Sequence, residues 1–183
     1  GDGIVGADGG LDIDRIRGLS EPALRRNARF RQRIERIPLF DHPVWVDDPT
    51  FRAEYHIRHT SLPEPGDDRQ LKRLAGRIFS QKLDPARPLW ELWFVEGLEG
   101  GRFAVISKIH HCMIDGISGA DLLAGFLQGA PEGAGNGAAP RWVPRPAPPS
   151  GLLLRDELVR RTTLPIAAAN AAFGAVRSPF RAL

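Results

Sequence analysis

One short apolar run ends at two adjacent histidines and leads directly into a helix pattern, and this transition constrains the fold more than any other stretch. Residues 103–109 are apolar and rich in β-branched side chains, which is typical of a strand buried on at least one face. Residues 116–127 carry apolar side chains at helical spacing and predict a helix. Between them lies the segment His110-His111-Cys112-Met113-Ile114-Asp115-Gly116, which holds two of the five histidines and the single Cys and Met.

The two histidines are expected to have different roles. Successive side chains of a strand point to opposite faces. If the strand runs through both residues, His111 lies on the face of Val105 and Ile109, and His110 on the face of Ile106. The face of His111 is the more apolar of the two. We therefore expect His111 to be the one that lies inside.

An imidazole at this position suits proton transfer, because a free imidazole titrates at about 6.5, near neutral pH. At a strand end it could take a proton from an alcohol or a thiol, a role that contributes roughly 10²–10⁴-fold in rate. Asp115 precedes the predicted helix, so a helix N-cap or a pairing with an arginine explains it better than a charge relay. Gly116 suits a tight backbone turn.

Other chemistries fit this segment less well. His111 and Asp115 at i, i+4 could share a metal ion, but no third ligand follows at motif spacing, so no metal site is predicted. Residues 116–119 do not form the G-x-S-x-G elbow of a serine nucleophile. Cys112 is better explained as a small buried apolar residue than as a nucleophile.

Residues 110–116 match HHxxxDG and so resemble the chloramphenicol-acetyltransferase-like superfamily of CoA- and carrier-dependent acyltransferases and condensation domains. The segment 84–98, which contains Pro88-Leu89-Trp90, is similar to the PLW segment of bacterial wax ester synthase/diacylglycerol acyltransferases. Three further segments resemble that family in order and spacing, residues 43–51, 55–59 and 62–66. The resemblance covers about residues 11–128.

This resemblance implies an O-acyltransferase that moves a long-chain acyl group from acyl-CoA to a fatty alcohol or a diacylglycerol. It implies that His111 is the general base, that His110 supports it, and that Asp115 and Gly116 shape the turn. Pro88, Leu89 and Trp90 would shape a substrate channel or, equally well, anchor the core. Acyl-CoA would be a co-substrate, and no cofactor is implied. The alternatives are a carrier-protein-dependent condensation enzyme and a non-catalytic lipid-surface module of the same fold.

The composition changes sharply after Leu127. We expect an N-terminal acyltransferase domain over residues 1–128, a Gly/Ala-rich and then Pro-rich linker over 129–150, and a helical segment over 151–183. Two helices, 152–159 and 166–176, are predicted on either side of Pro165. The resemblance implies a second, C-terminal half that this chain does not contain, with the active-site tunnel between the halves.

The remaining patterns predict an α/β fold with a mixed sheet and flanking helices. Residues 12–27 predict a helix, and a second helix begins at 67–68 with Leu71, Leu74, Ala75, Ile78 and Phe79 on its inner face. Strands are predicted over 30–37, 44–46 and 55–57, and a hairpin joins the strands 92–95 and 103–109.

Composition and charge exclude several classes. With 42% hydrophobic and 26% charged residues, the chain is typical of a globular domain, and no run approaches the roughly 18 apolar residues of a membrane span. The single Cys fits a reducing compartment, so a cytoplasmic location is expected. Six arginines between residues 25 and 36 predict a solvated surface, or contact with anionic lipid or CoA phosphates. Nucleic acid is not predicted, but peripheral contact with a membrane or lipid inclusion fits such substrates.

Overall fold

The computed structural model describes residues 4–6, 10–113 and 142–177 and divides into two compact units. The first unit comprises residues 1–34 and 45–145, and the second comprises 35–44 and 146–183. The elements in chain order are α1 (Ile13–Arg26), η1 (Ala28–Arg31), β1 (Gln32–Arg36), β2 (Pro43–Asp47), α2 (Ala53–His56), β3 (Ile57–Ser61), α3 (Asp68–Ser80), β4 (Trp90–Leu98), η2 (Glu99–Gly101), β5 (Arg102–Ile109), η3 (His111–Met113) and α5 (Ser150–Arg177). The prefix η marks a 3₁₀ helix.

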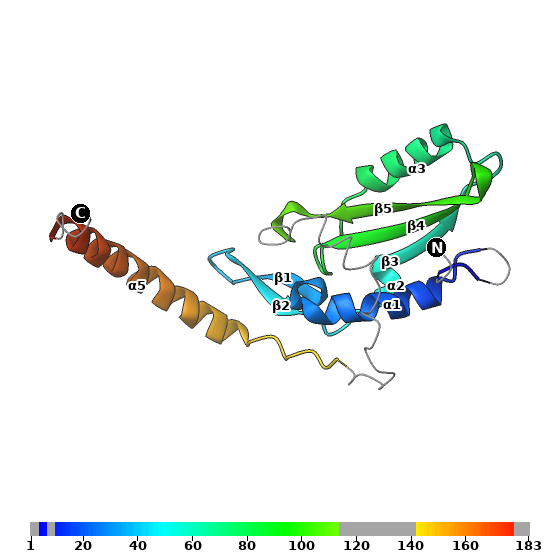
Figure 1. Ribbon diagram of the computed structural model, residues 1–183. Helices are drawn as coiled ribbons and strands as arrows, with labels where there is room; N and C mark the ends of the chain where they lie inside the picture. Colours follow the sequence, from blue (N-terminus) through cyan, green and yellow to red (C-terminus); the bar gives the residue numbers. More distant parts are fainter. Residues whose placement is uncertain (1–3, 7–9, 114–141, 178–183) are drawn as a thin grey trace. The chain divides into compact units, whose positions relative to one another are not determined.

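The main sheet has three strands in the order β3-β4-β5 (Figure 1). The central strand β4 runs parallel to β3 and antiparallel to β5. The predicted hairpin joins β4 to β5 through η2. The described residues therefore confirm the predicted mixed sheet with flanking helices. β1 and β2 form a separate two-stranded sheet.

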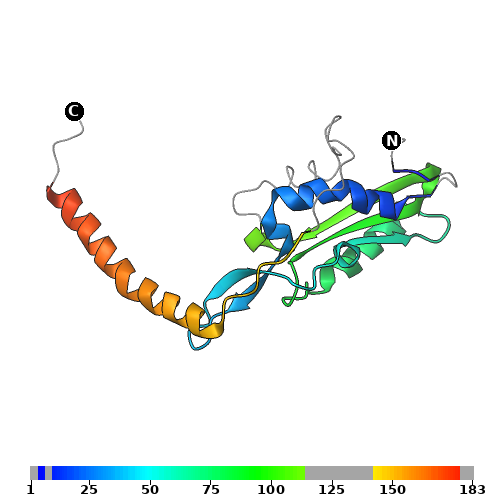
Figure 2. The same cartoon turned by 90° about the horizontal axis from the view of Figure 1, so that it is seen from below.

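The two faces of the main sheet are covered by different helices, as both views show (Figures 1 and 2). This follows from the two-residue period of the strand, which sends alternate side chains to opposite faces. Trp90, Leu92 and Phe94 of β4 pack in one apolar cluster with Ile16 and Leu24 of α1. The second cluster lies on the other face and joins the sheet to α3 through Leu62, Ile78, Val95, Leu98 and Ile106.

The helix α3 is fixed at both ends. A capping box at its start pairs the Asp67 side chain with the backbone N–H of Gln70, and the Gln70 side chain with the backbone N–H of Asp67. At its other end the Lys108 ammonium, from β5, donates hydrogen bonds to the carbonyls of Ile78 and Gln81. Lys108 thereby satisfies carbonyl groups that a helix C-terminus leaves unpaired.

Three details of the predicted elements are wrong. Phe79 is 57% exposed, because at about 100° per residue it lies well around the helix from buried Ile78. Residues 55–56 belong to the single-turn helix α2, and β3 begins only at Ile57. The strand predicted from Phe30 begins at Gln32, because the Asn27 side chain accepts a hydrogen bond from the Arg29 N–H and caps the intervening turn η1.

In the second unit, α5 runs without a break through Pro165, so the two separate helices predicted there are wrong. Proline has a helical φ and removes a single backbone donor, and a helix can continue through it with the loss of one hydrogen bond. In the part of the chain that the structure describes, no helix is long and apolar enough to span a membrane. The helix predicted over 116–127 lies outside the described residues.

Candidate active site

The two histidines lie just beyond the end of β5. The strand ends at Ile109, and His111 opens the turn η3. The alternation of the strand therefore does not extend to His111, and the expectation that this residue lies inside is wrong. Both His110 and His111 are exposed.

The backbone around the exposed histidines is held by buried neighbours. The His110 N–H donates to the Leu89 carbonyl at 3.0 Å, and the Met113 N–H donates to the His110 carbonyl at 2.9 Å. Met113 is only 4% exposed and belongs to the same apolar cluster as Trp90. Buried neighbours thus hold both ends of the turn, and the two imidazoles between them are exposed.

His110 and His111 differ in their partners. The Nδ1 atom of His110 accepts a hydrogen bond from the Cys112 N–H at 3.2 Å and lies 3.0 Å from the Cys112 Sγ. His111 has no side-chain partner among the described residues. The division of roles expected from the sequence, in which His110 supports and His111 reacts, stays a prediction. Cys112 is half-buried against the first apolar cluster, as a small apolar residue would be.

The three residues of the PLW segment lie in the core. Pro88, Leu89 and Trp90 are all buried, with Trp90 1% exposed. Trp90 pairs with Ile109 in the register of β4 and β5, one residue before His110. These contacts fit the core anchor that the sequence left as one alternative, and they connect the segment directly to the histidine turn. A role of the segment in lining a substrate channel stays a prediction.

Buried His56 is a residue that the sequence did not single out. Its ring stacks on Trp90 at 4.7 Å between centroids and on Phe51 at 5.2 Å. Its Nδ1–H donates to the Trp90 carbonyl at 2.8 Å. Burial lowers the pKa of His56 to about 4, against the opposing effects of this hydrogen bond and of Asp48. The sequence signal was its place in residues 55–59, one of the segments that resemble the family, and this did not mark His56 as buried.

This buried imidazole should make the protein less stable as the pH falls from 7 toward 4. The unfolded state takes up a proton near pH 6.5 and the folded state only near 4, so the free energy of unfolding falls by about 3 kcal/mol across that interval. We expect His56→Phe, which keeps a ring in the stack, to flatten the pH dependence between 6.5 and 4.5. Urea unfolding at several pH values measures the free energy of unfolding. If this free energy depends on pH as steeply in the variant as in the wild type, His56 is not the cause of the dependence.

Two candidate residues cannot be placed. Asp115 and Gly116 lie outside the described residues, so their assigned roles at the turn stay predictions. Among the residues that the structure does describe, no group of three or more His, Cys, Asp or Glu side chains could hold a metal ion.

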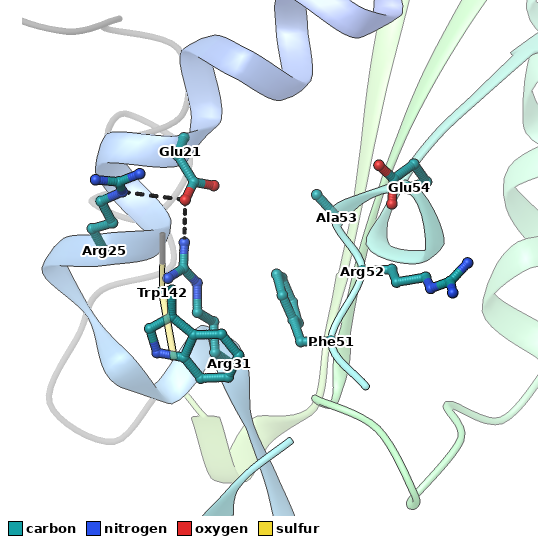
Figure 3. A pocket seen from close by; sticks show the side chains of 8 residues that line it. All are labelled: Glu21, Arg25, Arg31, Phe51, Arg52, Ala53, Glu54 and Trp142. Carbon is teal, nitrogen blue, oxygen red and sulfur yellow. Dashed lines mark hydrogen bonds and ion pairs between the residues drawn. The ribbon is translucent and has the colours of Figure 1, made fainter. Parts of the chain in front are cut away.

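A pocket of about 570 Å³ lies beside the C-terminal half of α1 (Figure 3). Of the three arginines that line it, Arg31 is buried and pairs with Glu21 at 2.6 Å, and Glu21 also accepts from Arg25. The Arg31 guanidinium lies 5.1 Å from the centroid of Trp142 and 5.7 Å from that of Phe51. The sequence did not predict this pocket, because Trp142 is more than a hundred residues distant from Arg31 along the chain.

The arginine-rich stretch 25–36 is largely engaged by neighbours. In addition to the pairs with Glu21, the Arg29 guanidinium stacks 4.1 Å from the Trp45 ring centroid, and Arg36 pairs with Asp41 at 2.8 Å. These contacts favour a structural role over contact with lipid or CoA phosphates.

Comparison with known proteins bears on the same segments. Residues 5–183 match the family model of the wax ester synthase/diacylglycerol acyltransferase catalytic domain. A putative diacylglycerol O-acyltransferase of Mycobacterium tuberculosis is 41% identical over 132 residues, which are 69% of this chain and 28% of that protein. The probable diacylglycerol O-acyltransferase tgs1 of the same species is 46% identical over 105 residues, which are 56% of this chain and 22% of that protein.

A solved structure also resembles the chain, the wax ester synthase/diacylglycerol acyltransferase from Marinobacter aquaeolei VT8. The two are 34% identical with a TM-score of 0.46, over 57% of this chain and 27% of that chain. The chain thus spans about a quarter of the length of these relatives.

Proposed function

Because this chain belongs to the wax ester synthase/diacylglycerol acyltransferase family, we propose that it supplies the catalytic histidine of an O-acyltransferase. The reaction moves a long-chain acyl group from acyl-CoA to the hydroxyl of a fatty alcohol or a diacylglycerol and gives a wax ester or a triacylglycerol. One observation carries the proposal: an exposed imidazole at the end of β5, on a turn held by buried Leu89 and Met113.

In the proposed reaction the neutral His111 imidazole takes the proton of the acceptor hydroxyl. The hydroxyl oxygen forms a bond to the thioester carbonyl carbon, and the carbon–sulfur bond then breaks. The CoA sulfur leaves with the electron pair and collects the proton from His111, which returns to its neutral form. In this proposal the acyl group passes directly from CoA to the acceptor, and the step uses no acyl-enzyme, cofactor or metal ion.

The neighbouring residues hold this imidazole in place. His110, whose Nδ1 binds the Cys112 N–H, keeps the turn closed behind His111. In this proposal Asp115 orients the start of the helix that the sequence predicts over 116–127, and Gly116 allows the backbone to turn there. Pro88, Leu89 and Trp90 act from the core by fixing the position at which β5 ends.

We further propose that a C-terminal half completes the active-site tunnel, as membership of the family implies. Substrates with long alkyl chains partition into lipid. The enzyme would therefore contact a membrane or a lipid inclusion peripherally, from the reducing cytoplasmic compartment that its single Cys fits.

An assay of the full-length protein with palmitoyl-CoA tests the proposed function. Hexadecanol and dioleoylglycerol are offered in parallel, in detergent, and the ester and the released CoA are both quantified. We expect one ester per CoA released with at least one of the two acceptors. If neither acceptor is esterified from palmitoyl-CoA but an acyl group on a carrier protein is transferred, the enzyme is of the condensation class. If the acyl group is transferred from neither donor, the protein is not an acyltransferase for these acceptors and the proposed function is wrong.

A further inference from the structure

The helix α3 carries a stripe of exposed cations on the face that points away from the sheet. Arg69, Lys72, Arg73 and Arg77 are spaced at i, i+3, i+4 and i+8, which places all four on one side of a helix. The opposite side contains Ile78, which is buried against the sheet. Lys82 extends the stripe just beyond the end of the helix.

These five cations have no polar partner in the part of the chain that the structure describes. Among the residues that the structure describes, none of the five side chains forms an ion pair or donates a hydrogen bond. This distinguishes α3 from the arginine-rich stretch 25–36, where Arg25 and Arg31 share Glu21. An exposed stripe of one charge with no internal partner repels itself, so it contributes little to folding.

A large apolar side chain borders the same stripe. Phe79 is 57% exposed and belongs to neither apolar cluster of the sheet. At about 100° per residue it lies between the buried side of the helix and Lys72. An exposed ring beside several cations on one helix is the arrangement of helices that lie in a membrane interface, where the ring enters the acyl region and the cations contact headgroups.

We propose that α3 is the surface by which this protein docks on an anionic lipid surface, with the stripe of Arg69, Lys72, Arg73, Arg77 and Lys82 on phosphate headgroups and Phe79 inserted between them. This docking surface rests on the proposed function, because an enzyme that acts on lipid substrates must contact lipid. Charge complementarity selects anionic over neutral lipid. The exposed ring at the edge of the stripe favours a lipid surface, whose acyl region can take up an apolar side chain.

The contribution of these cations to the affinity for an anionic membrane can be measured. Each Lys or Arg near an anionic membrane strengthens binding by about fivefold at modest ionic strength. Removal of two cations should therefore weaken binding by about 25-fold. The effect should shrink in high salt, because the screening length falls from about 10 Å at 0.1 M to about 3 Å at 1 M.

Vesicle cosedimentation of the full-length protein tests the docking surface. The vesicles are phosphatidylcholine alone or with about 30 mol% phosphatidylglycerol, which gives them an anionic surface. The test variant is Arg73→Gln with Arg77→Gln, and glutamine keeps helix propensity close to that of arginine. The matched control is Arg15→Gln with Arg102→Gln, which removes two exposed cations from other elements. A third variant, Phe79→Ser, removes the ring alone.

We expect wild-type protein and the control to bind phosphatidylglycerol vesicles about equally, and the α3 double variant to bind at least tenfold more weakly. Phe79→Ser should weaken binding at both low and high salt. Equal binding of the α3 variant and its control, or equal binding to neutral and anionic vesicles, would overturn the proposal. Binding that duplex DNA abolishes without regard to Phe79 would assign the stripe to nucleic acid instead. Ester formation in detergent should be the same in all these variants, so loss of docking and loss of activity are separate outcomes.

Discussion

Replacement of His111 by alanine should abolish ester formation, with the rate falling by roughly 10²–10⁴-fold, the usual contribution of a positioned general base. Thermal stability should hardly change, because the imidazole is exposed and no other described side chain depends on it. The measurements are initial rates with palmitoyl-CoA and the preferred acceptor, and thermal unfolding followed by circular dichroism.

His110→Ala is the matched control, since it removes an imidazole one residue away. His110 contacts Cys112, so its loss should loosen the turn and lower the rate by a smaller factor than loss of His111. If His111→Ala lost activity and its melting temperature also fell by several degrees, the loss of activity would follow from loss of structure, and His111 would be a structural residue.

Replacement of Trp90 by alanine should have the largest effect on stability, with a loss of about 3–5 kcal/mol in the free energy of unfolding. The side chain is almost fully buried, stacks on His56 and meets Phe30 edge-on at 5.4 Å. Its Nε1–H also donates to the Phe30 carbonyl at 2.9 Å, so truncation leaves a cavity and a buried carbonyl without its donor. Urea unfolding measures the loss.

Two further variants separate the contribution of the hydrogen bond from that of packing. Trp90→Phe keeps most of the packing but removes the donor to the Phe30 carbonyl, and it should cost about 1–3 kcal/mol. Trp93→Ala truncates a half-buried tryptophan of the same strand and should cost less than Trp90→Ala. A larger cost at Trp93 would contradict the placement of Trp90 at the centre of the core.

The parts of the fold that could be predicted are those where a local pattern and tertiary packing agree. Apolar spacing identified α1 and α3, and a glycine-containing turn between two apolar runs identified the β4–β5 hairpin. The pattern failed where a local side-chain hydrogen bond decides where a strand begins. The turn at Phe30 depends on a side-chain cap from Asn27, and neither hydrophobic period nor propensity encodes that cap.

For the candidate site, the sequence named the two histidines but gave their burial wrongly. The motif located His110 and His111, but the assumption of a strand through both gave the wrong burial, because η3 begins directly after β5. The link from Leu89 to His110 joins residues twenty-one positions apart and depends on the β4–β5 register, which the sequence does not show. His56 was missed for the same reason, since its partners Phe51 and Trp90 meet it only in the folded protein.

Chemical rescue tests most directly whether one exposed imidazole carries the reaction. Free imidazole is added to the His111→Ala and His110→Ala variants of the full-length protein, and ester formation from palmitoyl-CoA is followed over time. The account predicts that imidazole raises the rate of His111→Ala in proportion to its concentration and leaves that of His110→Ala unchanged. Ester formation at the wild-type rate by His111→Ala without any added imidazole would contradict it.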